Sequence, residues 1–126
     1  MTREEFKTYQ MLTKKFYECC NDIFSYIKKN YISVLSFGIK SEFCGGDYDN
    51  DNIVIIYCYQ GHYYDEEQEQ IYIPINNFFD EPYKWVDEWA NKLIVEKEAT
   101  RQRLDEIALQ KERNEYERLK KKFETT

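Results

Sequence analysis

The sequence lacks the long apolar runs that characterise membrane proteins and secreted precursors. No segment approaches the ~18 consecutive apolar residues that a membrane-spanning helix needs. The first ten residues, MTREEFKTYQ, contain no apolar core of a signal peptide. We therefore expect a cytoplasmic protein.

The sequence also offers few residues for catalysis. It has one histidine, His62, and no GxGxxG, Walker or GxSxG sequence. A pair of Cys58 or Cys44 with His62 would suit nucleophilic chemistry, but nothing in the spacing marks such a pair. The many carboxylates fall in predicted loops or on a charged helix, where carboxylates are normally solvated. The sequence thus predicts no enzymatic activity and no catalytic residue.

The four cysteines contain no CxxC pair. Cys19 and Cys20 are adjacent and cannot easily bridge each other, so free thiols in a reducing compartment are the simplest interpretation. Cys44, Cys58 and His62 could supply three soft ligands to zinc, but zinc sites usually show paired ligands at short spacing. Because Cys58 falls in the most apolar segment, a packed thiol is favoured. We expect no metal and no cofactor.

An aspartate-rich run from Asp47 to Asn52 invites comparison with a calcium loop. An EF-hand loop needs glycine at its sixth position and glutamate at its twelfth. Those positions here hold Asn52 and Cys58, and the flanking segments have the composition of strands. A solvated hairpin loop is therefore the favoured interpretation.

Acidic charge is concentrated in the middle of the 126-residue chain, whose net charge is −6. Residues 31–80 carry one lysine and nine acidic residues, whereas residues 81–126 carry eleven charges of each sign. A negative field repels phosphate and attracts basic protein surfaces. Direct binding of nucleic acid through the middle section is therefore disfavoured.

Hydrophobic periodicity predicts an α+β fold. Thr2 and Glu5 fit a capping box, and an apolar stripe follows at helical spacing. A three-stranded, possibly four-stranded, antiparallel sheet is expected next, and then a long charged helix. The predicted elements are a helix over 2–30, one or two strands over 31–43 with a bulge at Gly38, a turn over 44–52, a buried central strand over 53–59, an acidic connection over 65–70, an edge strand over 71–75 and a helix over 82–123.

The last helix divides the chain into two expected parts. Residues 1–95 form a compact domain, because Trp85, Trp89 and Leu93 recur at a spacing of four. Residues 96–126 are a projecting or partner-packed helix with few apolar residues. A heptad register placing Leu93, Leu104 and Ile107 at a/d also brings charged residues there, which argues against a regular coiled coil. The helix is solvated, self-associating (a homodimer) or partner-binding through Leu104, Ile107, Tyr116, Leu119 and Phe123.

Tyrosines are interspersed among the carboxylates of the two predicted acidic loops. Such a surface can imitate a phosphate backbone and occupy the basic groove of a nuclease or another nucleic-acid-binding protein, with tyrosines as anchors. The alternative is an acidic surface that serves only solubility. The candidate contact residues are Asp47, Tyr48, Asp49, Asp51, Tyr63, Tyr64, Asp65, Glu66, Glu67 and Glu69.

The strand Ile71–Ile75, the following Phe78-Phe79-Asp80, the tryptophan-bearing helix and the ending Glu115–Phe123 resemble a group of small phage-encoded proteins with a charged C-terminal helix. The resemblance covers about the last 60 residues and implies a phage or mobile-element origin inside a bacterial host cell. Small acidic phage proteins often inhibit host machinery, including anti-CRISPR proteins, so an inhibitor of a host defence or nucleic-acid-processing protein is the leading expectation. A structural or assembly protein that oligomerises through its last helix is the alternative.

Overall fold

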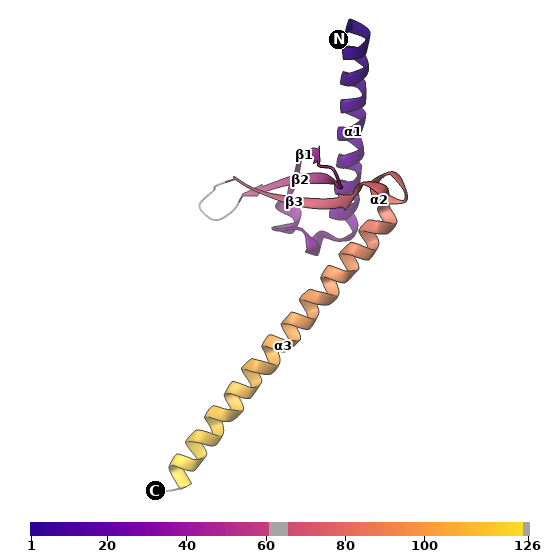
Figure 1. The fold of residues 1–126 in the computed structure, drawn as a ribbon. Coiled ribbons are helices and arrows are strands. Elements are labelled where there is room, and N and C mark those ends of the chain that lie inside the picture. Colours follow the sequence, from indigo (N-terminus) through magenta and orange to yellow (C-terminus); the bar gives the residue numbers. More distant parts are fainter. Residues whose placement is uncertain (61–65, 125–126) are drawn as a thin grey trace. The chain divides into compact units, whose positions relative to one another are not determined.

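The computed structural model describes residues 1–60 and 66–124 and has the predicted α+β architecture (Figure 1). The element order is α1 (Arg3–Asn30), η1 (Ile32–Val34), η2 (Gly38–Lys40), β1 (Glu42–Tyr48), β2 (Asn52–Gln60), β3 (Glu66–Pro74), α2 (Ile75–Phe79) and α3 (Pro82–Glu124). The chain separates into two compact units, Met1–Ala90 and Asn91–Thr126.

Helix α1 begins where the sequence predicts, because the Thr2 hydroxyl accepts a hydrogen bond from the Glu5 N–H at 3.1 Å. The helix packs on the sheet from Phe16 onward, and Cys20, Ile23, Phe24 and Ile27 are all 3% exposed or less. The first half of the predicted apolar stripe is exposed. Its exposed members are Phe6, Tyr9 and Leu12.

The sheet is a meander of order β1-β2-β3 with antiparallel pairs, so β2 is the central strand as predicted. Odd-numbered residues of β2 face α1, and Ile53, Ile55 and Tyr57 join the core. Ile71 and Ile73 of β3 extend this core, and Val86 of α3, 0% exposed, completes it. The core of the first unit is thus built from helix, strand and helix residues.

The segment predicted as a strand over 31–43 is wrong in large part. It forms the two short helical turns η1 and η2, and β1 begins only at Glu42. Phe37 and Gly38 adopt positive φ values of 60° and 48°, which an extended strand does not allow. The predicted bulge at Gly38 is therefore absent, and the register shift lies instead between Phe43 and Gly45.

The glycine-rich segment predicted as a turn belongs mostly to β1. Gly46 lies against α1 so closely that an added Cβ would be 2.8 Å from the Cys20 Sγ and 3.2 Å from a Phe16 ring carbon. Glycine in a strand often marks such a close approach of backbone to a neighbouring element. The true turn is short, since β1 ends at Tyr48 and β2 begins at Asn52.

The acidic connection predicted over 65–70 is also shorter than expected. Strand β3 already begins at Glu66, and it ends at Pro74, consistent with an edge strand. Ile75, predicted to close the strand, starts the short helix α2, and its N–H donates to the Asp51 carbonyl at 3.0 Å. Pairing with β2 draws the glutamates into the ladder.

Candidate functional site

The sheet carries charge of only one sign. Residues 41–83 contain ten acidic side chains and no lysine or arginine. All three strands fall within this stretch. The charged side chains of the strands themselves are therefore all negative, which favours a partner with a basic surface.

At one end of the sheet, the β1–β2 hairpin uses some of its carboxylates internally. The Asp49 Oδ1 accepts hydrogen bonds from the N–H groups of Asp51 at 2.8 Å and Asn52 at 2.6 Å. These two bonds lower the pKa of Asp49. Asp47 accepts from the Tyr48 N–H at 2.7 Å. Asp49 is thus an Asx-turn residue, and the ring of Tyr48, 72% exposed, remains available for contact.

At the other end, β3 distributes its glutamates over both faces of the sheet. Glu66 pairs with Gln60, whereas Glu67 and Glu69 pair with Tyr59 and Tyr57 on the α1 side. The Tyr59 hydroxyl donates to the Glu69 carboxylate at 3.1 Å. Burial, followed by hydrogen bonds to Glu69 and Glu67, raises the pKa of Tyr59 to about 12. The Glu69 carboxylate is therefore held against a neutral tyrosine hydroxyl.

The predicted contact residues do not form a single patch. The two hairpins lie at opposite ends of β2, and its nine residues span about 26–30 Å at ~3.3 Å per residue. Asp47, Asp49 and Asp51 lie at one end, and Glu66, Glu67 and Glu69 approach the other. Tyr63, Tyr64 and Asp65 lie outside the described residues.

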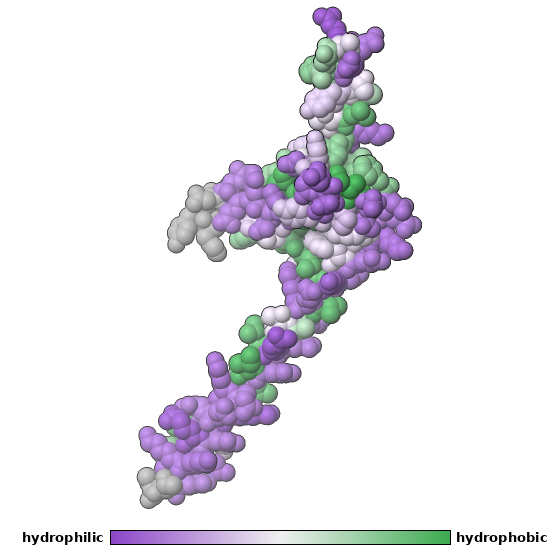
Figure 2. Space-filling view, in the orientation of Figure 1, coloured by the Kyte–Doolittle hydropathy of each residue, from purple (hydrophilic) through white to green (hydrophobic). Residues whose placement is uncertain are grey.

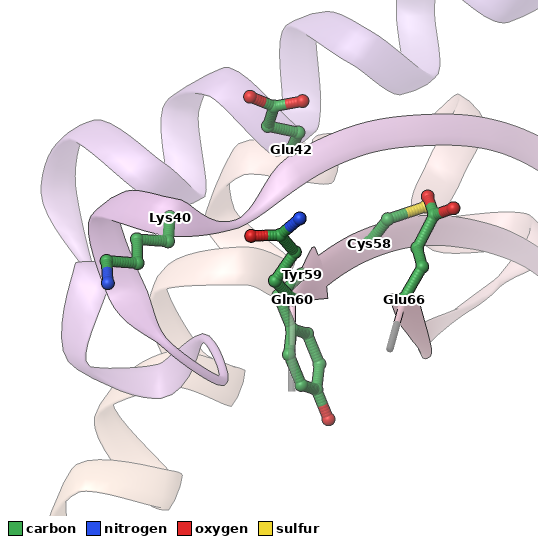
Figure 3. A pocket seen from close by; sticks show the side chains of 6 residues that line it. All are labelled: Lys40, Glu42, Cys58, Tyr59, Gln60 and Glu66. Atoms are coloured by element: carbon green, nitrogen blue, oxygen red, sulfur yellow. The ribbon is translucent and has the colours of Figure 1, made fainter. Parts of the chain in front are cut away.

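A cavity of about 540 Å³ opens at the end of the sheet where β2 ends and β3 begins (Figure 3). The view shows the Glu66 carboxylate beside the Cys58 sulfur, while Tyr59 points away from Gln60 on the opposite side of β2. The lining residues are Lys40, Glu42, Cys58, Tyr59, Gln60 and Glu66. The sequence did not predict this cavity, because Glu42 and Glu66 are brought together by the pairing of β1 and β3 with β2, and Lys40 by the turn η2 that precedes β1.

The structure corrects the expectation of four free thiols. Cys44 and Cys58 form a disulfide across β1 and β2, with their Cα atoms 5.9 Å apart. Cys44 has no direct ladder partner, because it occupies the register shift between Phe43 and Gly45, and Cys58 pairs with Glu42 instead. The bridge therefore joins Cys44 to Cys58 diagonally, although no short spacing links the two cysteines in the sequence. Cys19 is exposed and free, and Cys20 is buried and free. Burial and the neighbouring Cys19 raise the pKa of Cys20 to about 12.

One group of side chains has the composition of a metal site. The sulfur atoms of Cys44 and Cys58 and a carboxylate oxygen of Glu66 all lie within 4.8 Å of one another. Thiolates and carboxylates are established zinc ligands. His62, the third ligand considered from the sequence, lies outside the described residues.

The predicted partner residues of the last helix are all exposed. Leu104, Ile107, Tyr116, Leu119 and Phe123 are 40–74% exposed. Figure 2 shows hydrophilic residues over most of this part of α3, with separate hydrophobic ones between them. Two further exposed apolar residues, Val95 and Leu109, were not predicted as contacts.

Comparisons with known proteins add no relative. No protein-family model, curated protein or solved structure matches the chain. Within residues 1–60 and 66–124, no helix combines the length and apolar character required to cross a membrane.

Proposed function

We propose that the protein acts by binding, and that its acidic sheet engages a basic surface of a partner protein. The observation that carries this proposal is the charge of the sheet segment, which has ten acidic residues and no basic one between residues 41 and 83. Clusters of one sign steer association with a partner of the opposite sign and select against others.

The start of β3 is better suited to contact a partner protein than the β1–β2 hairpin is. Asp49 is occupied by its own turn, whereas Glu66 and Glu67 are exposed and lie on an edge strand. Tyr72, 50% exposed, adds an amphipathic aromatic surface further along the same strand, where it pairs with Val54 near the other end of β3. An edge strand also has unpaired backbone groups that an extended segment of a partner can use.

The partner class follows from the chemistry of the surface. Proteins that bind nucleic acid have basic grooves that accept a negatively charged surface. A protein that occupies such a groove would keep nucleic acid out and so inhibit the nucleic-acid-binding protein. Inhibition of host machinery is also the role implied by the resemblance to phage proteins. We therefore propose a host defence or nucleic-acid-processing protein as the target.

A capture experiment tests this proposal. The immobilised protein is exposed to nuclease-treated bacterial lysate, and the bound proteins are identified and then challenged with duplex DNA. We expect basic nucleic-acid-binding proteins that DNA displaces. The variant Asp47→Lys/Glu67→Lys should lose them, because it places positive charge at both ends of the sheet.

The matched control is Glu96→Lys/Glu98→Lys, which makes the same change in net charge on exposed residues of α3. This control should retain the captured proteins. Equal capture by both variants would show that net charge or another surface is responsible, and the proposal would then be wrong.

A second candidate function is assembly through the last helix. Val95, Gln102, Leu109, Tyr116 and Phe123 recur every seven residues on α3, and the four apolar members are 49–74% exposed. This row supplies one of the two apolar rows of a coiled-coil seam, whereas the second row has Glu98, Asp105, Glu112 and Leu119. Long helices of mixed charge also gain stability from packing on another helix.

Light scattering over a concentration series tests assembly. A dimer should form in the wild type and dissociate in Leu109→Ser/Tyr116→Ser, whereas Leu104→Ser, off this repeat, should leave it intact. A wild-type protein that is monomeric at all concentrations would exclude the assembly function.

A further inference from the structure

We propose that the reduced Cys44–Cys58 pair, together with Glu66, binds a thiophilic divalent cation of the Zn²⁺ class. This inference does not rest on the proposed partner-binding function, because it requires the two cysteines in reduced form; Glu66 is the one residue that the two surfaces share.

Three separate elements place the ligands together. The register shift in β1 brings Cys44 opposite β2, and its Cα lies 5.9 Å from that of Cys58. Cys58 pairs with Gln68 of β3, and Glu66 lies two residues earlier and therefore on the same face of the sheet. The strand pairing thus fixes the positions from which all three ligands extend.

The three ligand atoms are near enough to surround one ion once the disulfide, which bonds the two sulfurs in this structure, has been reduced. All three atoms lie within 4.8 Å of one another. With Zn–S bonds of ~2.3 Å and Zn–O bonds of ~2.0–2.2 Å, tetrahedral ligand atoms are roughly 3.5–3.8 Å apart. Side-chain rotation can open the reduced sulfur pair to that separation while the backbone keeps its register.

The surroundings leave room for a fourth ligand. Cys58 is 6% exposed, so its thiolate would be poorly solvated without a cation. Cys58 and Glu66 both line the 540 Å³ cavity, from which water can complete the coordination. Glu66 forms no ion pair with a basic side chain in the described parts of the chain, which leaves its carboxylate available to a cation.

The disulfide and the metal site exclude each other. A phosphine reductant breaks the S–S bond, supplies two electrons and becomes a phosphine oxide, while water provides the oxygen and the two thiol protons. Zn²⁺ then displaces both protons, and two thiolates and one carboxylate surround it. Metal affinity should therefore be found only in the reduced protein and should fall with decreasing pH.

Cobalt is a suitable probe because Co²⁺ bound by thiolates absorbs light in the near ultraviolet. The full-length protein is reduced with a phosphine, freed of reductant under inert gas and titrated with Co²⁺ and then Zn²⁺. We expect one equivalent of thiolate-bound Co²⁺ that Zn²⁺ displaces, and no such band in the disulfide form.

Variants assign the ligands. Cys58→Ser should abolish the band, and Glu66→Gln, which leaves both cysteines in place, should weaken Co²⁺ binding at least roughly tenfold. Cys19→Ser and Glu42→Gln are matched controls, a free cysteine and another carboxylate that lines the cavity, and both should bind normally.

The proposal is wrong if the reduced wild type gives no thiolate band, if Cys19→Ser removes it, or if Glu66→Gln binds with unchanged affinity. Circular dichroism shows whether Cys58→Ser is folded, and Glu66→Gln provides the test if it is not. The variant Asp47→Lys/Glu67→Lys should keep full Co²⁺ affinity, so failure of the metal site and failure of partner binding are distinguishable.

Discussion

Helices are stabilised in different ways in the two units of the chain. Within Met1–Ala90, α1 and the start of α3 bury residues such as Ile27, Val86 and Ala90 to 0% exposure. Within Asn91–Thr126, every described residue after Ile94 is exposed. The first unit is held by a shared core, whereas the second depends on local interactions within one helix.

This difference concerns where the free energy of folding arises. Burial of apolar side chains is the main stabilising contribution in a small domain. The second unit has instead pairs such as Glu115 and Arg118, whose charged groups approach to 2.6 Å in solvent. Exposed pairs of this kind contribute little to stability. Substitutions should therefore act strongly in one unit and weakly in the other.

The largest contrast is expected from removing one buried side chain. Ile73→Ala should lower the free energy of unfolding by about 3–4 kcal/mol, because Ile73 is 0% exposed in the core. Leu104→Ala, at a position 61% exposed in α3, should change it by less than about 0.5 kcal/mol in dilute solution. Urea unfolding measures both values, and similar losses would contradict the division into two units.

Reduction of the disulfide should affect only the first unit. A closed loop of this length, with the cysteines 14 residues apart, contributes about 3 kcal/mol by restricting the unfolded chain. A reductant should therefore shift the urea midpoint of the wild type and leave that of the matched Cys44→Ser/Cys58→Ser variant unchanged. Four reactive thiols in the denatured, unreduced wild type would rule the bridge out.

Acid should act on the first unit through Asp87. Its Oδ1 accepts hydrogen bonds from the hydroxyls of Tyr26 at 2.6 Å and Tyr31 at 2.7 Å, and these bonds lower its pKa below the ordinary 3.8. A lowered folded-state pKa contributes stability above pH 3.8 that is lost as pH falls through the folded-state value.

Unfolding measured between pH 7 and pH 2 should show this loss in the wild type and a smaller one in Asp87→Asn. The matched variant Asp105→Asn, exposed in α3, should behave like the wild type. An unchanged acid dependence in Asp87→Asn would assign the effect to other carboxylates.

The smallest effect is expected at the Thr2 cap. Thr2→Ala should cost about 1 kcal/mol of local helix stability. Since the first turns of α1 are exposed, the urea midpoint should stay the same while amide exchange near Tyr9 accelerates and that near Ile27 does not. Thr8→Ala is the control within the helix. Acceleration along all of α1 would show that the exposed half is coupled to the core.

Apolar patterns predicted the two long helices α1 and α3 from helical spacing and the central strand from a continuous apolar run, because these signals are local in the sequence. They failed over 31–52, where Phe37 adopts a left-handed conformation and Gly46, which leaves room for Cys20 and Phe16, pairs with Ile55 as part of a strand. The same limit applies to the site. Strand pairing joins Cys44, Cys58 and Glu66, and no sequence spacing reveals a β-bulge. The charges of β3 were predictable, but their division between two faces was not.

That division restricts the shape of any partner of β3. Glu66 lies on one side of the sheet, and Glu67 and Glu69 lie on the other, because successive residues of a strand alternate. A flat basic surface could reach only one of these sets. A partner that neutralises all three glutamates must contact the strand from both sides, for example by binding it in a deep cleft. A shallow groove would leave at least one carboxylate without a positive partner.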